Sequence, residues 1–416
     1  MTRFVVQITF VLLMTAMLVH ARQEHEQDRA GTPCPRCAWR PPAATRTVDV
    51  DDVGALQRAV AEARPGDTIL LADGRYPLQR MLEIAVPNVT LRSRSGNPDQ
   101  VVLHGRGMEG DHVGVAIGVG ATDVTIADIT IRSVGFHAVQ VRGERAASRI
   151  TLHNAKLLDT GQQLLKVSYA DNGPVAADGL VACSEFAYTT SAPSDYTNGV
   201  DILGTRAWTI RDNKFFRIRG PLTRGWKSGP AILAWKGAED TIVERNLIVD
   251  SYRGIALGLT PRYLKRPYDH LRGIVRNNAI VNLRPWADEA IEANGASDAR
   301  IEHNTVLVEG YVPWSIGVRF PTASAHVRNN LTNRRIIERE GGRMTNAGNV
   351  MTAARSWFVD APGFDLRLVA EAVRAIDAGV AIGDVRDDFD RTGRPFGRGP
   401  DVGAFEFVPG RGPASR

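Results

Sequence analysis

Charged and aromatic side chains recur at equivalent positions of short alternating segments in the middle of the chain. Lys166, Asp201 and Glu292 each directly follow the first apolar residue of such a segment. Trp235 and Arg319 each lie three residues beyond the equivalent apolar residue. Because alternate residues of a strand point to the same side, we expect these five side chains on one solvent-facing surface.

This mixture of bases, acids and an aromatic ring fits β-elimination on a uronic-acid polymer. The reaction needs a cation near the substrate carboxylate, because that negative charge opposes carbanion formation at C5. It also needs a base near the C5 proton, and Lys166 can serve if burial or neighbouring cations lower its pKa. Arg253, just before its segment, and Arg319 are the candidate carboxylate-neutralising residues. The simpler interpretation of Lys166 is an ordinary outward lysine beside Asp201.

Four insertions between the segments carry aromatic residues and cations. They span residues 168–179, 188–198, 220–229 and 260–270. Loops on a rigid scaffold are frequent sites of function, and aromatic faces can stack on sugar rings. We therefore expect Trp226 and Tyr263 to bind substrate together with Asp201, Trp235 and Glu292. The alternative is that the insertions are longer turns held to the scaffold by their own aromatic side chains.

Two other functions fit the same surface. Glycoside hydrolysis needs two carboxyl groups about 5 Å apart for retention or about 6.5–9.5 Å apart for inversion. Asp201 and Glu292 are too far apart for this, and Glu289, although close to Glu292 in sequence, lies at the start of its segment. A non-catalytic polysaccharide-binding scaffold is the remaining alternative. The formal charge of +5 favours an anionic partner. No nucleic-acid-binding module, nucleotide-binding loop or zinc-protease motif is found.

The segments that carry these residues belong to a repeat. Nine alternating segments end in a small polar residue, at intervals of 26–35 residues, which is roughly one β-helix coil each. The residues that end them are Ser93, Asp128, Asn154, Ser184, Asn213, Asn246, Asn278, Asn304 and Asn330. Stacked coils let each asparagine amide bond to the next, so we expect the last five to form a ladder. The frame of leucine-rich repeats is missing.

The chain divides into five segments. Residues 1–21 predict a secretory signal cleaved after Ala21, with an uncleaved anchor as the alternative. Residues 22–46 form a proline-rich linker, 47–83 a helical cap with the first strands, 84–335 the solenoid and 336–416 a C-terminal capping segment. No second apolar stretch is long enough to enter a membrane. We expect a secreted or periplasmic monomer.

Cysteines and aspartates give two further expectations. The linker contains Cys34 and Cys37, which predict a local disulfide, whereas Cys183 falls inside a repeat segment and is expected to be a small buried side chain. The aspartates at 384, 387, 388 and 390 could bind calcium but lack the spacing of known calcium loops, so a solvated loop is preferred. No cofactor is evident.

The sequence 55–76, ALQRAVAEARPGDTILLADGRY, resembles the opening of secreted right-handed parallel β-helix proteins of the pectin-lyase-like superfamily. That superfamily includes alginate lyases and chondroitinase B-like polysaccharide lyases. Segments 196–221 and 390–407 are similar to a closer group of bacterial β-helix proteins. The resemblance covers about residues 45–408. It implies an all-β, right-handed parallel β-helix of about nine coils with an N-terminal helical cap and a C-terminal capping segment.

The resemblance extends to one catalytic segment. Residues 162–168, QQLLKVS, are similar to the Lys-Ser strand that carries the base in chondroitinase B-like lyases, and this implies that Lys166 is a base. The Arg-His-Gly of those lyases, expected one coil later, is replaced here by Gly199, Val200 and Asp201. The family's calcium ligands and catalytic arginine therefore have no direct counterpart. The implied substrate is an acidic polysaccharide.

Overall fold

The computed structural model describes most of the chain. The described residues are 37, 39–109, 112–221, 229–260 and 266–411. The predicted signal at 1–21, Cys34, Trp226 and Tyr263 lie outside them. Within the described residues, no helix is long and apolar enough to cross a membrane.

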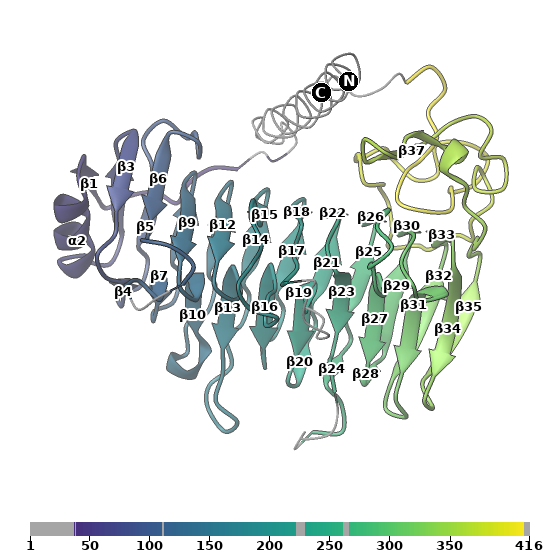
Figure 1. Ribbon diagram of the computed structural model, residues 1–416, viewed down its shortest axis with the longest axis horizontal. Helices are drawn as coiled ribbons and strands as arrows, with labels where there is room; N and C mark the ends of the chain where they lie inside the picture. The colour runs from purple at the N-terminus through teal and green to yellow at the C-terminus, as the bar shows by residue number, and fades with distance from the viewer. Residues whose placement is uncertain (1–36, 38, 110–111, 222–228, 261–265, 412–416) are drawn as a thin grey trace, which may run out of the picture.

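The chain forms a parallel β-helix, as expected (Figure 1). Successive coils contribute one strand to each of three parallel sheets, which hold twelve, ten and ten strands. Apolar residues alternate along each strand and stack in the interior from coil to coil. The stack that lines the second sheet contains Val139, Leu165, Val200, Ile232, Ile255, Ile291 and Ile316. All of them are buried, and the predicted equivalence of these positions is confirmed.

The first sheet lies beside the asparagine ladder. Its strands are β1 (Arg46–Val50), β2 (Asp67–Leu71), β5 (Thr90–Ser93), β8 (Thr125–Ala127), β11 (Thr151–His153), β14 (Leu180–Ala182), β17 (Thr209–Arg211), β21 (Ile242–Glu244), β25 (Ile274–Arg276), β29 (Ala299–Glu302), β32 (Ser324–Arg328) and β35 (Arg343–Ala347). The side-chain Nδ2 of each ladder asparagine donates to the side-chain Oδ1 of the asparagine in the next coil at 2.9–3.0 Å. The ladder runs through Asn213, Asn246, Asn278, Asn304, Asn330 and Asn349, which confirms the predicted stack of the first five.

The corner just before the ladder has a left-handed backbone. The residues there have φ of 46–58° and are Asp128, Asn154, Cys183, Asp212, Arg245, Asn277, His303 and Asn329. The alignment of Ser93, Asp128 and Asn154 with the ladder was wrong by one position, because Arg92 and His153 both pair with Ala127, and His153 pairs with Ala182 and not with Cys183. Asn154 donates instead to Asp128 at 2.8 Å. Asparagine and aspartate tolerate this backbone region better than most residues.

The second sheet carries the predicted site. Its strands are β4 (Leu82–Ile84), β7 (Val115–Val119), β10 (His137–Arg142), β13 (Leu165–Ser168), β16 (Val200–Leu203), β19 (Pro230–Trp235), β23 (Arg253–Leu257), β27 (Ile291–Asn294), β31 (Trp314–Arg319) and β34 (Arg335–Arg339). At the turn after this sheet lies a small sheet of β20 (Ala238–Glu239), β24 (His270–Leu271) and β28 (Ala296–Ser297). The 3-10 turn η2 (Gly143–Arg145) follows β10 directly.

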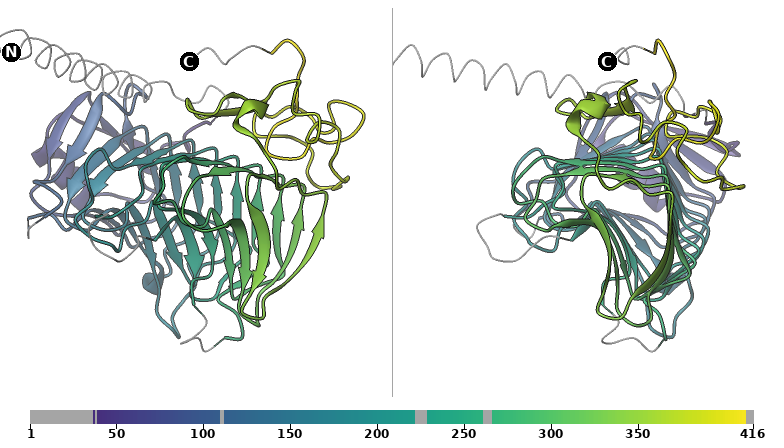
Figure 2. Two further views of the ribbon diagram at one scale, coloured as in Figure 1. Left: turned by 45° about the vertical axis from the view of Figure 1, so that its right-hand side comes forward. Right: turned by 90° about the vertical axis from the view of Figure 1, so that its right-hand side faces the viewer.

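The third sheet is partly covered by the C-terminal segment. Its strands are β3 (Gly74–Pro77), β6 (Val101–His104), β9 (Thr130–Val134), β12 (Lys156–Thr160), β15 (Glu185–Ala187), β18 (Lys214–Phe216), β22 (Leu247–Val249), β26 (Ala279–Asn282), β30 (Thr305–Val308) and β33 (Leu331–Thr332). Outward Val281, Leu307 and Leu331 form one apolar cluster with Phe358 and Phe405. The segment, with 3-10 turn η4 (Arg355–Trp357), β36 (Phe358–Asp360) and β37 (Asp365–Leu368), lies along the side of the last coils (Figure 2).

A short amphipathic helix lies at the N-terminal end of the solenoid. The predicted cap is apolar at helical spacing (Val53, Leu56, Ala59, Val60 and Ala63), and the helix α2 (Val53–Ala61) begins at the first of these residues. Asp52 caps it by accepting a hydrogen bond from the Ala55 backbone N–H at 2.7 Å. Leu56 and Val60 are buried in the main core, so the face predicted to be apolar is the one that packs on the first strands.

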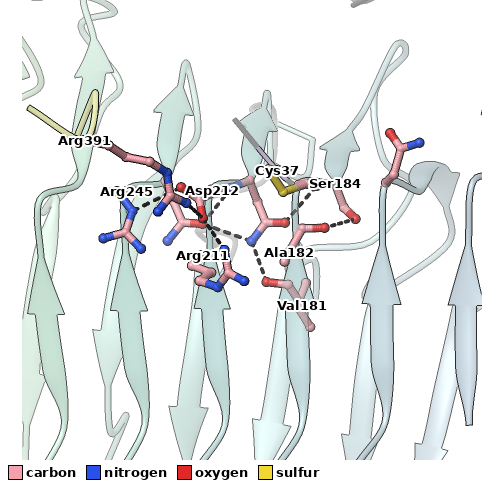
Figure 3. Close-up of a disulfide and its surroundings, with 12 residues drawn as sticks. Cys37, Val181, Ala182, Ser184, Arg211, Asp212, Arg245 and Arg391 are labelled. Carbon is pink, nitrogen blue, oxygen red and sulfur yellow. Dashed lines mark hydrogen bonds and ion pairs between the residues drawn. A yellow bond between two sulfur atoms is a disulfide. The ribbon is translucent and has the colours of Figure 1, made fainter. Parts of the chain in front are cut away.

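The structure pairs Cys37 with Cys183 (Figure 3). The expected local disulfide between Cys34 and Cys37 is therefore wrong, and so is the placement of Cys183 in the core. Cys183 occupies the left-handed corner, where the side chain is half-buried and reaches the N-terminal segment. Trp39 of this segment stacks on His153 with ring centroids 4.6 Å apart. The disulfide thus fastens the N-terminal segment to the middle of the solenoid.

Removal of this disulfide should destabilise the protein. Its cysteines are 146 residues apart, and such a cross-link stabilises mainly by restricting the unfolded chain. Cys183→Ser is expected to lower the free energy of unfolding by about 2–4 kcal/mol in guanidinium titrations. Reduction should destabilise the wild type to a similar extent and leave the variant unchanged. Equal stability of the two oxidised proteins would contradict the pairing.

Candidate active site

Strand pairing brings the predicted residues to one ladder on the outer face of the second sheet. The ladder runs through Gln140, Lys166, Asp201, Leu233, Ala256, Glu292 and Gly317. Trp235 and Arg319 lie on the neighbouring outward position. The strands hold these side chains on the same face because successive coils pair in register. Leu233 and Ala256 divide the polar residues into two groups.

The first group, called the lysine cluster, contains Lys166, Tyr196, Asp201 and Trp235. Lys166 Nζ lies 3.8 Å from Asp201 Oδ2 and donates to the Tyr196 hydroxyl at 3.3 Å. The Tyr196 hydroxyl donates to Asp201 Oδ2 at 3.4 Å, and Trp235 Nε1 donates to Asp201 Oδ1 at 2.8 Å. Lys166 Nζ also lies 4.9 Å from the centre of the Tyr196 ring. Asp201 therefore holds the other three side chains together.

Asp201 is fully buried although it lies on the outer face. Burial raises its pKa to about 6, while Lys166 and the hydrogen bonds from Trp235 and Tyr196 act in the opposite direction. Burial, followed by the charge of Asp201, also raises the pKa of Tyr196. The cluster therefore combines a cation, a hydroxyl group and a carboxylate with a higher proton affinity than an ordinary aspartate.

The raised pKa of Asp201 determines how its contribution to the unfolding free energy changes with pH. Between the ordinary pKa of 3.8 and the folded value of about 6, the folded protein binds more protons at Asp201 than the unfolded chain does. The contribution of Asp201 to stability must therefore fall as pH rises through this window, by about 3 kcal/mol in total. We expect the unfolding free energy of wild type minus that of Asp201→Asn to fall by this amount between pH 4 and pH 7. A difference that is flat or rises with pH would refute the buried carboxyl.

The second group, called the glutamate cluster, surrounds the start of β27. Arg253 Nε donates to Asp288 Oδ2 at 3.0 Å and lies 3.5 Å from Glu292 Oε1. Asn294 Nδ2 donates to Glu292 Oε2 at 2.6 Å. The pKa of Arg253 is raised, chiefly by the charge of Glu292. Arg253 is thus already paired with two carboxylates.

Glu289 lies beside Glu292 in the same cluster. A Cβ placed on Gly317 would be 1.9 Å from Glu289 Oε1, so the glycine provides the space for this carboxyl group. Gly317 pairs with Glu292 in the ladder, and the two carboxyl groups therefore occupy neighbouring positions. Glu289 Oε2 accepts a hydrogen bond from Arg339 Nη1 at 2.9 Å. Burial and then the charge of Glu292 raise the pKa of Glu289.

The predicted catalytic residues do not form one centre. Lys166 and Arg253 lie on β13 and β23, three coils apart, which corresponds to about 14 Å. Arg319 is paired with Glu340 at 2.6 Å and lies over the Phe320 ring. Tyr196 and Arg339 were not predicted as cluster members, and Glu289 was considered only as a possible partner of Glu292 in hydrolysis. Tyr196 was visible only as an aromatic residue in an insertion, and Arg339 is 50 residues from its partner.

Within the described residues, three possible metal ligands lie together, Cys37, Cys183 and Asp212, and two of them are joined in the disulfide. Of the four aspartates for which a solvated loop was preferred over calcium binding, three pair with arginines: Asp384 with Arg300, Asp387 with Arg245 and Asp390 with Arg411. The fourth, Asp388, accepts hydrogen bonds from the backbone of Thr392 and Glu406. The lysine and glutamate clusters on the outer face of the second sheet are therefore the candidate active site.

Solved structures resemble this chain along most of its length. The alginate lyase from Paenibacillus sp. str. FPU-7 is 18% identical, with a TM-score of 0.54 over 73% of this chain and 98% of that chain. The pectate lyase Pel9A is 15% identical, with a TM-score of 0.57 over 88% and 97%. The chain has the parallel β-helix fold of these lyases. No protein-family model and no curated protein matches the sequence. At this identity the likeness establishes the fold, because one fold supports many functions.

Proposed function

We propose that this protein is a carbohydrate-active enzyme that cleaves an acidic polysaccharide by β-elimination at the lysine cluster. The observation that carries the proposal is the array of Lys166, Tyr196 and Asp201 on the outer face of a β-helix sheet. The fold neighbours are named as lyases of alginate and pectate, which are acidic polysaccharides. A secreted or periplasmic location is part of the proposal and is supported by the disulfide, since disulfides persist in oxidising compartments.

The arrangement of charges favours a cationic role for Lys166 over the role of base. Lys166 Nζ forms an ion pair with Asp201 Oδ2 at 3.8 Å. The ammonium group can bind the uronate carboxylate and thereby stabilise the negative charge that develops at C5. The proton acceptor is then Asp201, reached through Tyr196. The alternative, in which neutral Lys166 takes the proton directly, is kept as an outcome of the test.

In the proposed step, the C5 proton passes to Tyr196 Oη while the hydroxyl proton passes to Asp201 Oδ2. The C5–H electron pair forms the C4–C5 double bond, and the C4–O4 bond breaks with its electron pair on O4, which takes a proton from water. The hydroxide ion that remains then takes the proton of Asp201 and restores the site. Trp235 would support a sugar ring. Arg319 would contact a sugar further along the face.

The test is incubation of the purified protein with a panel of uronate polymers. Ultraviolet absorbance of an unsaturated uronide supports elimination, and we expect it with at least one polymer. Reducing ends without that absorbance would replace the proposal with hydrolysis. Binding without either product would make the protein a polysaccharide-binding scaffold. Tyr196→Phe and Asp201→Asn should both reduce kcat more than they change KM, because proton transfer occurs only in the transition state.

A further inference from the structure

The glutamate cluster contains features that the elimination does not use. The Glu289 and Glu292 side chains are each about 6% exposed. Glu292 Oε1 is buried and accepts no hydrogen bond from the described residues, although it faces Arg253 at 3.5 Å. Glu289 reaches the space above Gly317. A buried carboxylate oxygen that accepts no hydrogen bond is costly, even beside a cation, so its retention next to a second carboxyl group requires a reason.

We propose that Glu289 and Glu292 are the acid and the nucleophile of a second reactive centre, which hydrolyses the glycosidic bond of an uncharged sugar. The centre lies four coils from Lys166 along the ladder, about 19 Å away. It is therefore separate from the lysine cluster and does not depend on the proposed elimination.

The environment of each carboxyl group suits its role. Glu292 is held by Asn294 and Arg253, and these contacts fix the orientation of its carboxyl group. Burial and the neighbouring charge of Glu292 raise the pKa of Glu289, in spite of Arg339. Two neighbouring carboxyl groups, one of which has a raised pKa, are the arrangement that glycosidases use.

The charge of the cluster indicates the class of substrate. Arg253 and Arg339 contribute two positive charges, and Asp288 and Glu292 contribute two negative charges when Glu289 is protonated. A balanced site has no excess cation for a uronate carboxylate, so the sugar at the cleaved bond should be neutral. This distinguishes it from the sugar expected at the lysine cluster.

Aromatic residues lie next to the cluster. Tyr252 and Trp286 are stacked with ring centroids 6.3 Å apart, and the Tyr252 hydroxyl lies 3.2 Å from that of Tyr311. The Asp288 backbone N–H donates to the Tyr252 carbonyl oxygen at 2.9 Å, which places Tyr252 beside the cluster. Such rings can support the apolar faces of sugars.

The reaction proceeds in two balanced steps. An oxygen of Glu292 attacks C1, and the C1–O bond breaks with its electron pair on the glycosidic oxygen, which takes the proton of Glu289. Water then adds to C1 and gives its proton to Glu289, while the Glu292–C1 bond breaks and returns its electron pair to Glu292. Neighbouring strands are about 4.8 Å apart, close to the carboxyl separation of about 5 Å that accompanies retention. The first product should therefore keep the anomeric configuration of the substrate.

The test uses the full chain with neutral polysaccharides and aryl glycosides. We expect reducing ends without unsaturated uronide, and retention in proton NMR of the first product. Glu289→Gln and Glu292→Gln should each lower kcat by about 10³-fold or more. The matched control is Glu185→Gln, since Glu185 on β15 also has a pKa raised by burial but is half-buried and lies on the third sheet.

The outcomes separate this centre from the lysine cluster. Lys166→Met should keep the hydrolysis, and Glu289→Gln should keep any elimination. Should the glutamate variants fail to fold, the wild type still decides, because absence of hydrolysis on every neutral glycoside overturns the proposal. Hydrolysis that survives in folded Glu289→Gln and Glu292→Gln overturns it equally. Trapping of a 2-fluoroglycoside on Glu292, located by peptide mass spectrometry, would support the assigned nucleophile.

Discussion

Lys166→Ala is expected to lower kcat on a uronate polymer by about 10²–10³-fold, the usual effect of losing one preorganised electrostatic group. The variant also leaves fully buried Asp201 without its cation, so a loss of stability of about 1–3 kcal/mol should accompany it. Initial rates of unsaturated uronide formation and thermal unfolding of the same samples measure the two effects separately.

Lys166→Arg decides between the two roles of this residue. A guanidinium keeps the positive charge but is never deprotonated in proteins. If Lys166 binds the carboxylate, the arginine variant should keep a substantial part of the activity that alanine loses. If Lys166 is the base, both variants should be equally inactive. Full activity of Lys166→Ala would remove the lysine cluster from the mechanism.

The fold could be predicted from the sequence because two independent residue patterns repeat once per coil. The alternation around Val139 and its counterparts defines the strands, and the asparagines from Asn213 to Asn330 define one turn of every coil. A parallel β-helix repeats the same local environment, so a residue type that suits one coil suits the next. The alignment failed at Asp128 and Asn154 because both residue types suit the left-handed corner as well as the ladder.

Contacts between segments outside the repeat could not be predicted in this way. Cys37 pairs with a residue 146 positions away, and no local pattern specifies which corner the N-terminal segment crosses. The same holds for Arg339, which reaches Glu289 from β34. Periodicity assigned the outward face correctly but gave no information on which polar groups would meet there.

The path of one insertion decides which of its side chains reaches the lysine cluster. The segment 188–198 is one of the insertions with aromatic residues, and its Tyr196 contacts Lys166 and Asp201 directly. Those contacts depend on how the segment folds back over β13 and β16, which strand register does not determine. The strands therefore position Lys166 and Asp201, and the insertion between them adds Tyr196 to the site.

The largest stability effect is expected from Arg394 in the C-terminal segment. Arg394 and Glu406 are almost fully buried and form an ion pair with 2.5 Å between Nη1 and Oε1. Arg394 also donates to the backbone oxygen of Gly403 at 2.7 Å and to Asn277 Oδ1 of the solenoid at 3.2 Å. It therefore joins three parts of the chain in one buried polar network.

Arg394→Met should lower the free energy of unfolding by about 3–5 kcal/mol, because it leaves the Glu406 carboxylate buried without a cation. Guanidinium titrations and limited proteolysis of the C-terminal segment measure the effect. Arg398→Met is the matched control, since Arg398 is 93% exposed and its contact with Asp377 should contribute little. Arg394→Met combined with Glu406→Leu should recover much of the loss, because replacing both charges removes the unpaired carboxylate. If the double variant is less stable than the single one, the network contributes more than compensation of a buried charge, and this explanation of its role is wrong.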